Sequence, residues 1–164
     1  MANMGFEKIR PRKRRKKTKT PKSIAWDWMS RWVRLSAVVA LSEKLGFDPC
    51  DRLGECYTCG KIGDVKYMDG GHFKSRDIGG SSGLYFDARA IRVQCKVCNA
   101  HRQGCPTEFR EGLVKEYNEA TVQELEQIHR LPSRWRPREF PGLIMHYQVC
   151  VQELLKETGI RKWW

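Results

Sequence analysis

Apolar residues recur at helical spacing in three stretches of the chain. In residues 23–45 bulky side chains follow a period of about 3.6 and Gly46 comes directly after, so we expect a helix that ends there. Its apolar positions are Ile24, Trp28, Trp32, Leu35 and Val39. Amphipathic spacing returns over residues 107–129, with a break near Asn118, and over residues 137–158. The pattern predicts one leading helix and two or three trailing helices.

The middle of the chain has a different pattern. Residues 65–68 read as a short strand, which Gly70 and Gly71 interrupt with a bulge or a sharp turn. Residues 84–93 supply a second short strand or a turn, and a helix is expected from Cys95 toward Gly104. Short strands between longer helices predict an α+β fold.

Positive charge is concentrated at the amino-terminal end of the 164-residue chain, whose formal net charge is +12. Ten lysines and arginines lie between residues 8 and 22 with no acidic residue among them, so residues 1–22 are expected to be a disordered arm that binds phosphate. The continuous basic run, expected to contact DNA, is Arg12, Lys13, Arg14, Arg15, Lys16 and Lys17. A solubility or localisation role is the alternative. The rest divides into one domain, residues 23–158, and a tail, residues 159–164.

Nothing in the sequence predicts a membrane segment. The longest simple aliphatic run, residues 37–41, is far shorter than the ~18 apolar residues a spanning helix needs. The basic start is not followed by a secretory hydrophobic region, so we expect a cytoplasmic protein without a membrane partner.

The cysteines predict a metal site. An odd number, seven, in a reducing compartment favours metal binding or burial over disulfides. Two CxxC pairs supply four thiolates for one structural zinc ion: Cys56, Cys59, Cys95 and Cys98. The segment between the pairs is long enough to carry a functional site; the alternative is a zinc ion that only holds a binding module together. Cys50, Cys105 and Cys150 are expected to be small buried hydrophobes.

Three residues near the cysteines have the chemistry of a phosphodiesterase. His72 follows the strand and the glycine pair, and an imidazole with a pKa of ~6.5 can deprotonate an attacking water. Asn99 directly follows the second CxxC pair and can bind a divalent cation through its oxygen. Asp69 is the nearest second ligand. Residues three apart on a regular strand face opposite ways, so Asp69 can join His72 only if the glycines twist or bulge the chain.

Three strings resemble one family in order and spacing: GHFKSR at residues 71–76, FDARAI at 86–91 and QCKVCN at 94–99. They are similar to the phage NinG (Rap) recombination-endonuclease family, of the HNH or ββα-metal type, and the resemblance extends over about residues 24–156. It implies a zinc-stapled HNH core, His72 as general base and Asn99 as a ligand of catalytic Mg²⁺ or Mn²⁺. It further implies branched DNA substrates such as Holliday junctions or D-loops. A phage-encoded protein would act in the host cytoplasm.

The chain departs from the family pattern at two positions. Ala90 stands where the family pattern has an asparagine that supports the loop. Asp87 could take over that role, or it could simply form a turn. Gly71 stands where many HNH sites place an acid or a histidine, which leaves the second cation ligand open.

Two arginines and a possible dimer complete the expected site. Arg102 shares a helical face with Asn99 and Arg76 lies in the preceding loop, so either can bind phosphate, whereas His101 would point away. A symmetric homodimer would place two sites on two strands. The alternatives are a non-catalytic zinc module that binds DNA, and an HNH nuclease that cuts ordinary duplex, as homing or restriction enzymes do.

Overall fold

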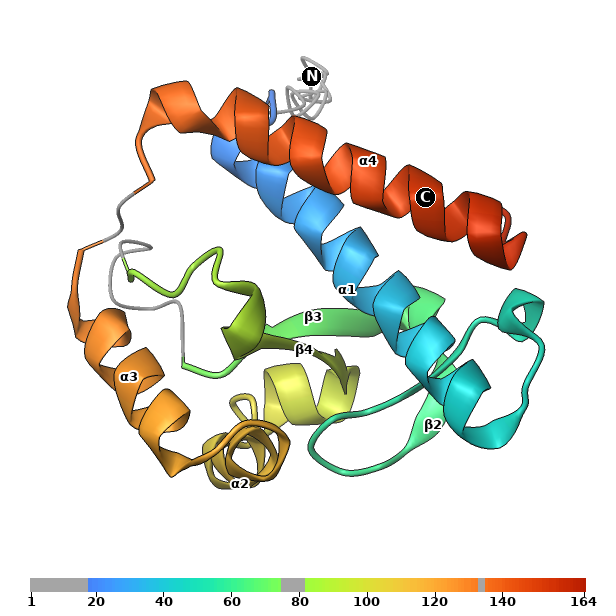
Figure 1. Cartoon of the computed structure of the whole chain (residues 1–164), viewed down its shortest axis with the longest axis horizontal. Helices are drawn as coiled ribbons and strands as arrows, with labels where there is room; N and C mark the ends of the chain where they lie inside the picture. Colours follow the sequence, from blue (N-terminus) through green and yellow to red (C-terminus); the bar gives the residue numbers. More distant parts are fainter. Residues whose placement is uncertain (1–17, 75–81, 133–134) are drawn as a thin grey trace, which may run out of the picture.

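A long central helix organises the computed structural model, which describes residues 18–74, 82–132 and 135–164. Helix α1 (Pro21–Leu45) packs against α4 (Phe140–Thr158) on one side and two small antiparallel sheets on the other (Figure 1). One sheet pairs β1 (Leu53–Glu55) with β2 (Ile62–Asp64), and the other pairs β3 (Met68–His72) with β4 (Ile91–Cys95). The remaining helices are α2 (Pro106–Glu116) and α3 (Glu119–Arg130). The mixed α+β class is confirmed.

Helix α1 begins and ends at residues suited to helix termini. The Thr20 hydroxyl accepts a hydrogen bond from the Ser23 N–H at 3.2 Å, and Pro21 occupies the first turn. At the other end Gly46 adopts a left-handed φ of 73°, and its N–H donates to the Ser42 carbonyl at 2.7 Å. The expected end at Gly46 is confirmed, and the start lies two residues earlier than expected.

The buried face of α1 is wider than the expected stripe. Its fully buried residues are Ala25, Met29, Val33, Leu35, Val38 and Leu41, of which only Leu35 belongs to that stripe. Because α1 packs on both α4 and the sheets, apolar contacts extend around much of its circumference. Trp28 and Trp32 pack against the core but remain partly exposed.

The strand expected at residues 65–68 lies further along the chain. Residues Val65–Tyr67 form a 3₁₀ turn, capped by the Asp64 carboxylate, which accepts from the Lys66 N–H at 2.8 Å. Strand β3 then continues through both glycines and pairs residue for residue with β4, from Met68 with Cys95 to His72 with Ile91. The bulge expected at Gly70 and Gly71 is therefore wrong.

The two glycines instead permit close approach of neighbouring groups. A Cβ atom at Gly71 would lie 1.9 Å from Oε1 of Gln94, and one at Gly70 would lie 3.2 Å from Oγ of Ser30 on α1. The first distance is far below van der Waals contact. A side chain therefore has no room at Gly71 without displacement of Gln94.

The helix expected after Cys95 is only a short π-helical turn, Val97–His101. The Arg102 N–H donates to the Val97 carbonyl at 2.9 Å, which closes the turn. Gln103, Gly104 and Cys105 then all adopt positive φ, and this left-handed run turns the chain into α2.

The trailing helices agree with the expected number. The break at Asn118 is confirmed, because its side chain caps α3 by accepting from the Thr121 N–H at 2.8 Å. A 3₁₀ turn, Pro137–Glu139, precedes α4. A second buried cluster joins α2 and α3 to the loop before β4; it contains Phe73, Leu84, Ala90, Phe109, Leu113, Val122 and Leu125. Ala90 is 1% exposed there, so an asparagine would bury an amide among apolar side chains.

In residues 18–74, 82–132 and 135–164, no helix is both long enough and apolar enough to cross a membrane.

We predict that Gly71→Ala destabilises the fold by about 1–3 kcal/mol, the usual cost of overpacking. Gln94 is fully buried and held by two hydrogen bonds, so it cannot swing away from the new methyl group. Urea unfolding measures the change. The matched control is Gly142→Ala on α4, where a Cβ meets nothing within 4 Å and stability should be kept or slightly raised. Equal stability of the two variants would contradict this account of Gly71.

Candidate metal centre and adjoining polar site

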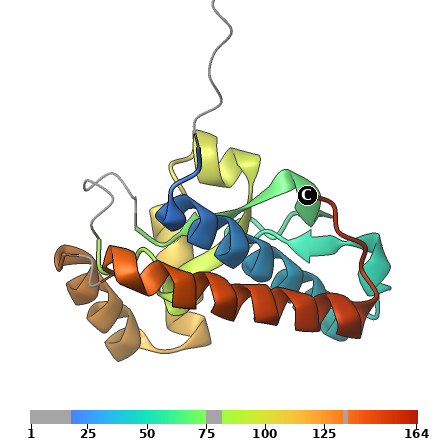
Figure 2. The same cartoon turned by 90° about the horizontal axis from the view of Figure 1, so that it is seen from above.

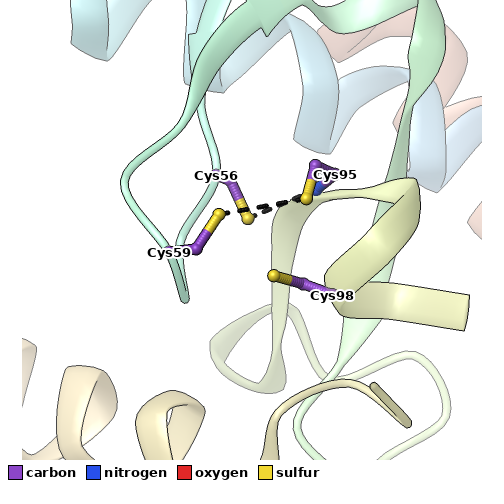
Figure 3. A group of neighbouring side chains, drawn as sticks. All are labelled: Cys56, Cys59, Cys95 and Cys98. Carbon is purple, nitrogen blue, oxygen red and sulfur yellow. Dashed lines mark hydrogen bonds between the residues drawn. The ribbon is translucent and has the colours of Figure 1, made fainter. Parts of the chain in front are cut away.

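Four cysteine side chains converge from two turns (Figure 3). Cys56 and Cys59 come from the turn after β1, Cys95 ends β4, and Cys98 lies in the π-helical turn. Their sulfur atoms all lie within 4.8 Å of one another, and those of Cys59 and Cys95 are 3.9 Å apart. Tetrahedral zinc with bonds of about 2.3 Å separates its sulfurs by about 3.8 Å. The cluster can therefore hold one structural metal ion such as zinc.

Backbone hydrogen bonds shape the first cysteine turn. The Gly60 N–H donates to the Cys56 carbonyl at 2.8 Å, and Gly60 has the left-handed φ of 70° that this turn requires. The Cys95 N–H donates to Sγ of Cys56 at 3.3 Å, which links the two CxxC pairs directly.

The environment favours a thiolate at Cys56. Burial opposes its ionisation, but hydrogen bonds from the Cys95 N–H and from Thr58 outweigh burial and lower the pKa of Cys56 to about 6. Burial raises the pKa of the Cys98 thiol, so this second ligand depends on the charge of a bound cation to ionise.

The three other cysteines differ in burial. Cys105 is 3% exposed, as expected, and its thiol lies beside the Cys98 carbonyl at 4.0 Å. Cys50 is exposed in the 3₁₀ turn after α1, so its expected burial is wrong, and Cys150 on α4 is only half-buried. Only Cys105 behaves as a core residue.

Asp69 and Asn99 lie together beside the cysteine cluster. The Asn99 amide nitrogen donates to Oδ2 of Asp69 at 3.0 Å, and Lys96 forms an ion pair with the other carboxylate oxygen. Both Asp69 and Asn99 are half-buried, whereas the Lys96 side chain is 61% exposed. The structure thus brings together the two residues predicted to bind a catalytic cation.

His72 contacts helix α1 and the loop before β4. Its Nε2 lies 3.1 Å from the Tyr85 carbonyl, and its ring stacks on Trp26 of α1 with centroids 4.4 Å apart and an interplanar angle of 26°. The Tyr85 ring also lies beside it, with centroids 5.3 Å apart. A carbonyl oxygen only accepts hydrogen bonds, so Nε2 is the donor in this contact.

Asp69 and His72 face opposite sides of β3, because the strand is regular. Asp69 shares its face with Gln94, on the side of the cysteine turns, whereas His72 faces α1. Among the described residues β3 pairs only with β4, so its other edge is where the two faces meet.

Asp87 supports the loop that presents the Tyr85 carbonyl. Its carboxylate accepts from the Arg89 backbone N–H at 3.0 Å, and from Nε and Nη2 of Arg89 at 3.1 and 2.9 Å. This is a turn-forming aspartate that also braces the loop from Leu84 to Ala90.

Of the two arginines and the continuous basic run expected to contact phosphate, the structure describes only Arg102. Arg102 forms an ion pair with Glu108 at 3.0 Å. Arg102 was expected to share a helical face with Asn99, but that expectation assumed α-helical spacing, and the segment is a π-helical turn. His101 is exposed. Arg76 and the basic run from Arg12 to Lys17 lie outside the described residues.

Sequence reasoning missed several residues that complete the site. Gln94, fully buried, donates from Nε2 to the Thr58 hydroxyl at 3.1 Å and to the Gly104 carbonyl at 2.8 Å, so it ties the first cysteine turn to the start of α2. A polar residue between Val93 and Cys95 was its only indication in the sequence. Nothing in the sequence indicated the roles of Trp26 and the Tyr85 carbonyl, because these roles depend on contacts between distant segments.

Neither of two cavities among the described residues contains the whole polar site. One of about 630 Å³ lies between α1, the first cysteine turn and the end of α2, and its lining includes neither Asp69, His72 nor Asn99. A much smaller one is lined by His72 but by neither Asp69 nor Asn99. Asp69 and Asn99 therefore lie outside both cavities, in contrast to the enclosed pocket that is typical of a small-molecule site.

The family model described as bacteriophage Lambda NinG protein matches residues 7–157. The chain belongs to the NinG family. The matched range begins before the expected residue 24, so family membership includes much of the basic arm.

Curated NinG relatives are about one-third identical to the chain over the residues that align. Protein ninG of Salmonella phage P22 is 33% identical over 104 residues, 63% of this chain and 49% of the relative. The corresponding protein of Escherichia phage lambda is 31% identical over 104 residues, with the same two coverages. The chain thus spans about half the length of these relatives. No solved structure matches the chain.

We predict that Cys98→Ser loses bound zinc and lowers the stability by at least about 3 kcal/mol, or about 10 °C in thermal midpoint. Cys98 is 1% exposed within the cluster, so a lost ligand cannot be replaced by solvent without disturbing the core. Metal analysis and thermal unfolding with and without a chelator measure both effects. Cys150→Ser, on the outer side of α4, is the control; equal zinc content in both variants would exclude Cys98 as a ligand.

Proposed function

We propose that this NinG family member is a metal-dependent DNA endonuclease with an HNH, or ββα-metal, core. The observation that carries the proposal is the contact between Asp69 and Asn99 beside the four cysteines, with His72 on the same strand. In this proposal strands β3 and β4 and the π-helical turn would take the places of the two strands and the helix of such a core.

His72 has the arrangement of a general base. The Tyr85 carbonyl holds the proton on Nε2, so Nδ1 can take a proton from an attacking water, and the stacked Trp26 ring restricts rotation of the imidazole. Asp87 contributes indirectly, because it holds the loop that supplies the Tyr85 carbonyl.

Asp69 and Asn99 would hold the catalytic cation. Rotating the Asn99 amide by 180° turns its oxygen toward the Asp69 carboxylate, which gives the oxygen ligands that Mg²⁺ and Mn²⁺ prefer. The cation would stabilise the charge that builds on the phosphate and the leaving oxygen. Lys96, released from Asp69, has an exposed side chain that can reach a phosphate.

A phosphodiester would lie along the edge of β3 that, among the described residues, pairs with no other strand, between the proposed base and the cation. Asp69 and His72 are three residues apart, which is about 10 Å along a strand. DNA lying along this edge could meet His72 from one face and the Asp69–Asn99 pair from the other.

The substrate and assembly follow from the family resemblance. We extend the proposal to branched recombination intermediates, such as Holliday junctions and D-loops, cut in the host cytoplasm. A homodimer would cut two strands symmetrically. The basic arm, and Arg76 and Arg102, would add phosphate contacts.

We predict that His72→Gln and Asn99→Ala each reduce Mg²⁺- or Mn²⁺-dependent DNA cleavage at least about 100-fold, the typical contribution of a general base. Zinc content and thermal midpoint should stay near wild type, since neither side chain belongs to the cysteine cluster. His101→Gln, an exposed histidine two residues after Asn99, is the matched control and should cleave normally.

Cleavage retained by His72→Gln would require a different base. A wild-type protein that binds DNA but cuts no linear, nicked or branched substrate with either cation would leave the non-catalytic zinc module as the function.

We also predict faster cleavage of a four-way junction than of a linear duplex built from the same arms. Single-turnover rates on the two substrates measure the preference. Equal rates would favour a nuclease of ordinary duplex instead.

A further inference from the structure

Indole and guanidinium groups gather on α1 and on the segment after α4. This indole–arginine cluster consists of Trp28, Arg31, Arg34, Trp163 and Trp164. Cζ of Arg31 lies 4.5 Å from the Trp28 ring centroid and 5.0 Å from that of Trp164. The guanidinium is therefore held between two indoles, which belong to opposite ends of the chain.

Arg34 connects the cluster to the proposed cation site. Its Cζ lies 5.7 Å from the Trp163 ring, and its Nε donates to the Ser30 carbonyl at 3.1 Å. Burial lowers the pKa of Arg34, and the Asp69 carboxylate is the main influence that raises it. Arg34 therefore lies close to Trp163 and within electrostatic reach of the Asp69 carboxylate.

The chain after α4 is folded back onto the molecule. Figure 2 shows it turning from the end of α4 toward the start of β3. Ile160 is 5% exposed and Trp163 packs against the main core, so the expected tail, residues 159–164, is attached to the domain. This attachment brings Trp164 beside α1.

The packing of residues 159–164 against the domain does not by itself account for the exposed part of the indole–arginine cluster. Ile160 and Trp163 already supply the buried apolar contacts, whereas Trp164 keeps 39% of its surface exposed. Arg161 and Lys162 next to it are also exposed, and the nearby acid Asp27 is already paired with Lys19. The surface combines an accessible aromatic face with excess positive charge, which matches the chemistry of nucleic acid.

We propose that the indole–arginine cluster binds the DNA strand that leads away from the cut. Arg34 and Arg31 contact successive phosphates beyond Asp69, and Trp164 stacks on an unpaired base. An indole reaches a base face only where the base is not stacked within a duplex, so the cluster favours strands that are unpaired near a branch or an end. This assignment rests on the proposed nuclease function.

The test measures DNA binding with Ca²⁺ in place of Mg²⁺, so that affinity is read without cleavage. Fluorescence anisotropy compares a blunt duplex with the same duplex carrying a single-stranded overhang. Trp164→Ala should weaken overhang binding about 10-fold, the loss of one stacked base, and change blunt-duplex binding little. Trp164→Phe keeps a stacking face and should restore most of the affinity.

Charge is tested separately. Arg31→Gln should reduce the slope of log affinity against log salt by about one phosphate contact. Lys115→Gln removes one exposed charge from α2 and should leave the slope on the overhang substrate near wild type. Trp164 is largely at the surface, so thermal midpoints close to wild type are expected for its variants.

Unchanged overhang affinity in Trp164→Ala would overturn the assignment and reduce the cluster to a structural contact. Cleavage of the same substrates with Mg²⁺ separates the two proposals. If the wild-type protein cleaves DNA and Trp164→Ala binds the overhang normally, only the DNA-binding role of the cluster is rejected. If Trp164→Ala loses overhang binding but the wild-type protein cleaves nothing, only the nuclease function is rejected.

Discussion

The convergence of four cysteine sulfurs is the constraint on which the polar site depends. Cys56 and Cys59 belong to the turn between β1 and β2, while Cys95 and Cys98 flank the junction of β4 with the π-helical turn. The direct hydrogen bond from the Cys95 N–H to Cys56 and the Gln94 contacts to Thr58 and Gly104 reinforce the same junction. Because Asn99 directly follows Cys98, fixing the sulfurs also fixes the amide that meets Asp69. A lost cysteine should therefore disturb the polar site as well as the fold.

Helix α1 supplies the second constraint. It packs on α4 and on both sheets, and the same helix carries Trp26, which stacks on His72, and Arg34, which lies near Asp69. Ser30 of α1 approaches Gly70 closely, so that a Cβ atom there would make a tight contact with its hydroxyl. The leading helix thus does more than cover the core, because it forms one wall of the polar site and continues into the indole–arginine cluster.

The geometry of β3 determines how the polar groups are distributed. A regular strand puts Asp69 and His72 on opposite faces. The two faces meet at the edge of β3 that, among the described residues, pairs with no other strand. The contact between His72 and the Tyr85 carbonyl and the contact between Asp69 and Asn99 hold the two halves independently. This division explains why the polar groups do not line a shared cavity.

The sequence by itself determined the mixed α+β class, the end of α1 at Gly46, the cap at Asn118 and the pairing of the two CxxC turns, because each depends on residues close together in the chain or on a strong ligand spacing. It did not determine the course of β3. The glycine pair predicted a bulge, but the strand is regular, and the close approach of Gln94 leaves no room for a side chain at Gly71. The wide buried face of α1, the single π turn and the packing of residues 159–164 were likewise decided by tertiary contacts. The spacing of residues along the chain indicates local structure, whereas only the folded chain specifies which distant groups each residue must accommodate.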